Sequence, residues 1–272
     1  MRRVLTAAVL APLALALVLF GPKWLITIVV GAVAILAAWE FLGLAARCGA
    51  KPPRLAVMAA LVALFAGNYQ WPDQTLIILS GICLSLFGCC TFRKPVERVL
   101  VNSCSSIFAV VYVGLTMLAL PTLREQSNGP TLVVFLLFVV WAGDITALYT
   151  GRLWGKSKMA PAISPNKTWV GAIGSVVGSV LVTLGLYWLS LQLLQWNFTK
   201  LSFADEAWWY WLVVAVLVNI AAQVGDLAES ALKRSAGVKD SGSLLPGHGG
   251  VLDRIDALLI AAPVLWWAQI IR

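Results

Sequence analysis

Residues 230–256 read SALKRSAGVKDSGSLLPGHGGVLDRID, and this polar stretch organises an otherwise apolar chain. It holds the only histidine of the protein, His248, and its glycines at 242, 247, 249 and 250 allow the backbone to approach a ligand closely. Carboxylates, cationic side chains and glycine-rich backbone gathered in this way suit an anion together with its metal ion. The alternative interpretation is a solvated loop between two membrane spans.

Apolar runs of about 20 residues, the length that crosses a bilayer core as a helix, flank this stretch and recur along the chain. The composition is 60% hydrophobic and 12% charged, with a mean hydropathy of +0.88, which argues against a soluble globular protein. The sequence predicts an all-α integral membrane protein, a polytopic bundle of about nine transmembrane helices. Their predicted positions are 4–20, 24–44, 55–70, 75–90, 99–121, 131–152, 168–194, 207–232 and 251–271.

The first run, 4–20, could also be a signal peptide, because Arg2 and Arg3 precede it. No small-x-small cleavage site follows the run before Gly21, so we interpret it as the first span.

The basic residues predict how these helices are oriented. The formal net charge is +8, and in a membrane protein an excess of lysine and arginine marks the cytoplasmic side, so no nucleic-acid partner is expected. When the connections are assigned to alternate sides, 16 of the 20 lysines and arginines fall on one side. The other side receives Lys23, Arg124, Lys200 and Arg272. We therefore expect the N-terminus inside and the C-terminus outside.

Two of the predicted cytoplasmic connections are long and polar. We divide the chain into N-terminal transmembrane helices, 1–130, and a C-terminal transmembrane catalytic half, 131–272, which carries both connections as motif loops, 151–168 and 233–254. The helix before each loop carries a Gly-Asp pair eight residues before an arginine. Eight helical residues span about 12 Å, so Asp144 and Asp226 are expected below the cytoplasmic surface of the membrane, where an ionisable residue is a functional candidate.

Two pairs of acidic residues near the second loop predict a cation site. Asp226 and Glu229 are three residues apart and share one face of a helix, as do Asp253 and Asp256 at the start of the next helix. Oxygen ligands on two neighbouring helices could hold a divalent cation. The alternative is that these carboxylates form buried salt bridges with the arginines at 234 and 254.

Helix starts beside the two loops would supply an anion site. Residues 164–168, SPNKT, lead into one predicted helix, and residues 246–250, PGHGG, lead into another. Backbone N–H groups at a helix N-terminus favour an anion, and Lys167 and Lys239 would add positive charge. The simpler alternative is that these lysines only mark the cytoplasmic side.

The polar stretch also resembles the signature of the phosphatidate cytidylyltransferases (CDP-diglyceride synthases). It follows S-x-x-K-R, four residues, K-D-x-G, then P-G-H-G-G-x-x-D-R-x-D, and residues 142–169 and 225–230 are also similar to this family. The resemblance implies that CTP and phosphatidate are converted to CDP-diacylglycerol and pyrophosphate, with magnesium, by a homodimer among membrane lipids. A second cation such as K⁺ is left open. The implied location is the inner membrane of a bacterium, with the active site facing the cytoplasm.

The residue pattern and the resemblance together predict the site. The expected catalytic residues are Asp226, Asp253, Lys167 and Lys239, and the expected metal ligands are Asp226, Asp253, Glu229 and Asp256. The expected substrate-binding residues are Asp144, Ser164, Asn166, Lys233, Arg234, Asp240, His248, Gly249, Gly250 and Arg254. We expect His248 to order its turn rather than to act in catalysis.

Two other functions stay open at this point. A CTP-dependent lipid kinase could use the same nucleotide site but would transfer the γ-phosphate, and it would need a base to take the proton of the lipid hydroxyl. A membrane transporter would also carry intramembrane aspartates, but its charges are expected near the bilayer midplane on broken helices. In cytidylyl transfer the attacking phosphate oxygen is largely ionised at pH 7, so charge neutralisation and positioning are needed rather than a base.

Overall fold

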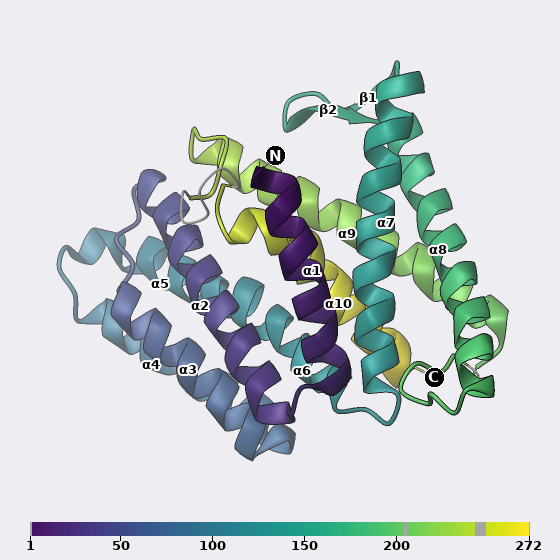
Figure 1. Cartoon of the computed structure of the whole chain (residues 1–272). Coiled ribbons are helices and arrows are strands. Elements are labelled where there is room, and N and C mark those ends of the chain that lie inside the picture. Colours follow the sequence, from purple (N-terminus) through teal and green to yellow (C-terminus); the bar gives the residue numbers. More distant parts are fainter. Residues whose placement is uncertain (1, 204–205, 243–248, 272) are drawn as a thin grey trace. The chain divides into compact units, whose positions relative to one another are not determined.

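The computed structural model describes residues 2–203, 206–242 and 249–271, which are mostly helical (Figure 1). The helices are α1 (Arg2–Phe20), α2 (Lys23–Arg47), α3 (Arg54–Gln70), α4 (Thr75–Thr91), α5 (Val99–Ala109), α6 (Thr116–Arg124), α7 (Gly129–Trp154), α8 (Trp169–Gln195), α9 (Trp208–Ser235) and α10 (Leu252–Ile270). Short 3₁₀ turns, η1 (Pro72–Gln74) and η2 (Val96–Arg98), precede α4 and α5, and a π-helical segment, η3 (Val110–Leu115), joins α5 to α6.

All nine segments that the sequence predicts as spans are helical. Six segments of the described chain are long and apolar enough to cross a membrane, namely Lys23–Arg47, Pro72–Thr91, Val96–Arg124, Gly129–Trp154, Trp169–Gln195 and Trp208–Ser235. The three others differ for physical reasons: α3 has 17 residues, the apolar part described for α1 covers only Ala11–Phe20, and α10 carries three charged residues near its start. The structure therefore supports an integral membrane protein, whereas the count of nine spans stays a prediction.

A short β-hairpin follows α7, which the all-α prediction did not include. Its strands, β1 (Lys158–Ala160) and β2 (Ser164–Thr168), are antiparallel (Figure 1). Residues 164–168, which we expected to lead into a helix, form β2 and lead directly into α8 at Trp169. Thr168 ends the strand and caps the helix, since its Oγ1 accepts a hydrogen bond of 3.1 Å from the N–H of Gly171.

The described chain divides into two compact units that are built from interleaved segments. The first unit comprises Met1–Val9, Pro22–Pro121 and Leu232–Ile255, and the second comprises Leu10–Gly21, Thr122–Ala231 and Asp256–Arg272. Helix α9 contributes to both units, because the boundary falls near its C-terminal end.

Each unit has its own packed interior. In the first unit, α2, α3, α4 and α5 pack against one another in succession, and Leu42, Leu61 and Leu64 are fully buried. In the second unit, α7 and α8 run side by side (Figure 1). Gly174 and Gly178 of α8 face threonines of α7, where a side chain would collide, so this G-x-x-x-G pattern brings the two helices close.

Candidate functional site

A cavity of about 750 Å³ in the second unit is lined by α7, the β-hairpin, α8 and α9. Five charged side chains line it: Asp144 and Arg152 of α7, Lys158 of β1, Lys167 of β2 and Asp226 of α9. Asn166, Ser175 and Gln223 add polar groups to the lining. A cavity of this size that mixes carboxylates with an excess of cations suits a polyphosphate together with a metal ion.

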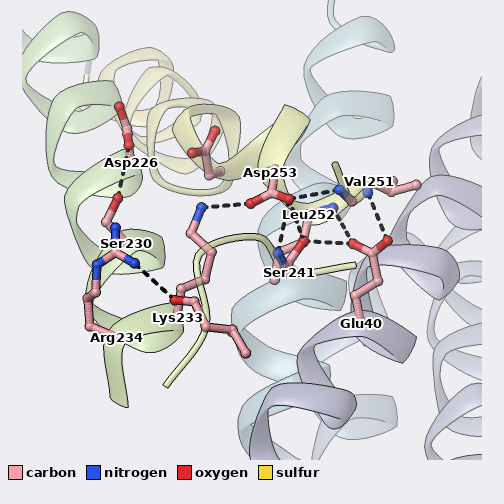
Figure 2. Close-up of polar contacts among 12 residues, drawn as sticks. Glu40, Asp226, Ser230, Lys233, Arg234, Ser241, Val251, Leu252 and Asp253 are labelled. Carbon is pink, nitrogen blue, oxygen red and sulfur yellow. Dashed lines mark hydrogen bonds and ion pairs between the residues drawn. The ribbon is translucent and has the colours of Figure 1, made fainter. Parts of the chain in front are cut away.

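An ion pair at this cavity joins the hairpin to α9. Lys167 Nζ lies 2.7 Å from Asp226 Oδ2, and the two side chains keep 24% and 38% of their surface exposed. The hydroxyl of Ser230, one turn further along α9, lies 3.5 Å from the other carboxylate oxygen (Figure 2). An ion pair that remains this exposed adds little to stability. Both charges are therefore available to a ligand.

The first unit holds a second carboxylate, Asp253, at the start of α10 (Figure 2). Lys233 Nζ donates to its Oδ1 at 2.6 Å. Its Oδ2 accepts the backbone N–H groups of Gly250 at 2.8 Å and Ser241 at 3.0 Å, and the Ser241 hydroxyl lies at 3.0 Å. Asp253 therefore ties the last turn of α9 to the start of α10 and to the loop between them.

Glu40 of α2 contacts the network around Asp253, and our sequence-based site prediction did not select it. Its carboxylate is buried, with 5% exposed, and it accepts the backbone N–H groups of Val251 at 3.0 Å and Leu252 at 2.9 Å. The hydroxyl of Ser241 lies 2.9 Å from Glu40 Oε2, so this serine touches both Glu40 and Asp253 (Figure 2). The available signal was a lone carboxylate within the apolar run 24–44.

Two glycines of residues 246–250 are required by the close packing of this backbone against Asp253 and Glu40. Gly249 has a φ of 79°, in the left-handed region that favours glycine. A side chain at Gly250 would collide with the Ser241 hydroxyl and with the carboxylate of Glu40. The glycine-rich stretch thus allows its backbone to pack against two carboxylates.

The structure brings the predicted residues together in two groups. Asp144, Asn166, Lys167 and Asp226 share the cavity of the second unit. Lys233, Gly250 and Asp253 share the hydrogen-bond network of the first unit. Arg152, Lys158 and Gln223 also line the cavity, and our sequence-based prediction did not select them.

The other predicted residues belong to neither group. Lys239, Asp240 and Arg254 are exposed, and Arg234 donates to the carbonyl of Val238 at 3.0 Å. Ser164 belongs to β2, but the cavity lining does not include it. His248 lies outside the described residues.

The acidic residues have distinct environments. The side chain of Glu229 is fully buried on α9, while Asp256 Oδ1 accepts the N–H of Ala257 at 2.8 Å. Asp226 pairs with Lys167 and Asp253 pairs with Lys233, whereas our alternative interpretation paired these carboxylates with arginines. Within the described residues, no group of three or more His, Cys, Asp or Glu side chains is gathered for a metal ion. A cation at either aspartate would need oxygen ligands from a substrate or water to complete its shell.

Comparison with known proteins gives a consistent result. Residues 1–271 match a family model described as "Cytidylyltransferase family". A relative from Brucella abortus is 48% identical over 156 residues, which cover 57% of this chain and 53% of the relative. A relative from Staphylococcus saprophyticus is 38% identical over 194 residues, 71% of this chain and 67% of the relative. Both relatives are named phosphatidate cytidylyltransferase. The matched part of this chain thus spans about half the length of the Brucella relative.

Proposed function

This chain belongs to the cytidylyltransferase family, and we propose from this premise that it transfers the cytidylyl group of CTP to phosphatidate. The products would be CDP-diacylglycerol and pyrophosphate. The family match over residues 1–271 carries the proposal. The name shared by the Brucella and Staphylococcus relatives supports phosphatidate as the lipid substrate, and the charged cavity supports a nucleotide polyphosphate.

The proposed chemistry is an in-line displacement at phosphorus. An anionic phosphate oxygen of phosphatidate attacks the α-phosphorus of CTP and forms a new P–O bond. The bond from the α-phosphorus to the oxygen that bridges it to the β-phosphorus breaks, and pyrophosphate leaves with that oxygen. The nucleophile is largely ionised at neutral pH, so the protein has to position the phosphates and neutralise their charge. Arg152, Lys158 and Lys167 supply positive charge in the cavity.

We propose magnesium as the cofactor, because the carboxylates fit a hard cation. Asp226 is partly exposed on the cavity wall. In Asp253, Oδ2 faces three donors, whereas Oδ1 faces the ammonium group of Lys233, so Oδ1 is the atom that could exchange a lysine for a cation. A bound magnesium ion would neutralise phosphate charge and polarise the phosphoryl group. The roles of Glu229 and Asp256 as metal ligands stay predictions. A second cation such as K⁺ also stays a prediction.

Pyrophosphate release tests the proposed function directly. Purified protein in mixed micelles that contain phosphatidate is expected to release pyrophosphate from CTP when magnesium is present. Micelles in which diacylglycerol replaces phosphatidate are the matched control, because they lack the phosphate nucleophile. Equal pyrophosphate release from both kinds of micelle would contradict transfer to phosphatidate.

We further propose that nine helices cross the inner membrane of a bacterium, with the site facing the cytoplasm and two chains forming a homodimer. The uneven distribution of lysine and arginine supports the orientation. Reporter fusions after Arg272 and within residues 151–157 are expected to report opposite sides of the membrane. If both reporters were cytoplasmic, the span count would be wrong by one.

A further inference from the structure

We infer that Gln223 reads the base of the bound nucleotide by presenting a fixed hydrogen-bond acceptor, Oε1, to the exocyclic amine of cytosine. This inference rests on the proposed function and adds to it a residue that determines nucleotide specificity. Gln223 lies on α9 one helical turn before Asp226, and both residues line the same cavity. A phosphate chain near Asp226 and a base near Gln223 would therefore occupy one continuous space.

A hydrogen-bond chain behind the cavity wall determines which way the amides point. It begins at Ser179, whose hydroxyl donates its one proton to the carbonyl of Val139 at 2.8 Å. Ser179 Oγ can then only accept from its other neighbour, Asn219. Asn219 Nδ2 donates to it at 2.8 Å and to Ser175 Oγ at 2.9 Å. The amide nitrogen of Asn219 therefore faces the serines, and its Oδ1 faces the opposite way.

The orientation of Gln223 follows from that of Asn219. Gln223 Nε2 donates to Asn219 Oδ1 at 2.7 Å and to the carbonyl of Ala172 at 3.2 Å. These two bonds use both protons of the amide group. If the amide were flipped, Oε1 would face two acceptors. The other polar atom of the amide, Oε1, is therefore left as an acceptor. No described residue donates a hydrogen bond to it.

The packed helices around this hydrogen-bond chain hold its side chains in place. Ser175, Ser179 and Asn219 are each at most 2% exposed and lie on helices that could cross a membrane. Gly143 of α7 faces them, and a side chain there would collide with the amide of Asn219. Polar groups buried in a membrane span are costly and mark functional sites. Here they hold the amide of Gln223, a residue that lines the cavity.

A fixed acceptor distinguishes the two common pyrimidines. Cytosine carries an amino group, a hydrogen-bond donor, at the position where uracil carries a carbonyl oxygen, an acceptor. Opposite Gln223 Oε1, cytosine gains a hydrogen bond, whereas uracil places two acceptors against each other. A site built to bond one group rejects an analogue that lacks it, because the buried polar group is left unpaired.

Competition between nucleotides in one reaction tests this inference. Purified protein receives phosphatidate, magnesium and equal concentrations of CTP and UTP, and the ratio of cytidine to uridine lipid product is measured by mass spectrometry. The wild type is expected to favour CTP strongly. Gln223→Met keeps the size of the side chain but removes the acceptor, and it is expected to lower the ratio about tenfold or more. Asn219→Leu is expected to lower the ratio too, because the Gln223 amide then loses the partner that orients it.

The ratio does not depend on how much protein is folded, because both products come from the same molecules. Gln192→Met, an exposed change on α8 outside the cavity lining, is the matched control and is expected to keep the wild-type ratio. An unchanged ratio in Gln223→Met, or a wild type that uses UTP as well as CTP, would overturn the inference.

The failure of the proposed function can be distinguished from the failure of this inference. If the wild type makes no lipid product from CTP, the proposed function fails, and equilibrium dialysis with labelled CTP and UTP then tests Gln223 separately. Preferential CTP binding that is lost in Gln223→Met would support the role of Gln223. Equal binding of the two nucleotides by the wild type would contradict it.

Discussion

Asp226→Asn is expected to reduce kcat at least about 100-fold without unfolding the protein. The carboxylate lines the charged cavity, and the substitution removes the negative charge that a magnesium ion requires while it keeps the shape of the side chain. Metal stabilisation of transition-state charge is worth several kcal/mol, and each 1.4 kcal/mol is tenfold in rate. Steady-state turnover of CTP across a magnesium titration measures the effect.

The melting temperature of Asp226→Asn distinguishes a loss of turnover from misfolding. The ion pair between Asp226 and Lys167 is partly exposed, so breaking it is expected to change the melting temperature little. Asp73→Asn, an exposed change in η1, is the matched control and is expected to leave turnover unchanged. Near-normal turnover of Asp226→Asn at saturating magnesium would rule out a ligand role for this carboxylate.

Glu40→Gln is expected to lower kcat about tenfold or more and to raise the magnesium concentration needed for half-maximal activity. The buried carboxylate accepts two backbone N–H groups at the start of α10. The substitution turns one acceptor oxygen into a donor that faces other donors. Hydrogen bonds to a charged group contribute about 1.5–3 kcal/mol each, so the loop that carries Asp253 is expected to shift.

The magnesium titration makes the Glu40 prediction specific. A variant that is merely less stable would lose active protein but keep the wild-type magnesium requirement, whereas displacement of Asp253 changes that requirement. Ser241→Ala removes the hydroxyl that touches both carboxylates and is expected to shift the titration in the same direction. Glu97→Gln, an exposed change in η2, serves as the control. An unaltered magnesium requirement in Glu40→Gln would contradict the positioning role.

The helices could be predicted from sequence because each is specified locally. Apolar runs of about 20 residues fold as helices wherever they lie in a membrane, and all nine predicted segments are helical. The hairpin could not be predicted in the same way. Its strands have only three and five residues, too few for a periodic pattern, and Ser164 to Thr168 read equally well as the start of a helix.

The partners of the site residues could be predicted less well, because they depend on contacts between distant parts of the chain. Asp226 pairs with Lys167 across 59 positions of sequence, and Ser241 contacts Glu40 across 201 positions. Our alternative interpretation named Arg234 and Arg254 as partners, because spacing along the chain shows only neighbours that are close in sequence. The series of hydrogen bonds that links Ser179, Asn219 and Gln223 likewise arises from packing between helices.

The central claim, cytidylyl transfer, is tested most directly by following two labels of CTP. Membranes that contain the protein, supplied with phosphatidate and magnesium, are incubated in parallel with [α-³²P]CTP and with [γ-³²P]CTP, and the lipid is extracted into chloroform. The α-label is expected to enter the lipid, and the γ-label is expected to stay in the aqueous phase as pyrophosphate. Entry of the γ-label into the lipid would instead show a CTP-dependent kinase, and no label in the lipid from either nucleotide would contradict the enzyme itself.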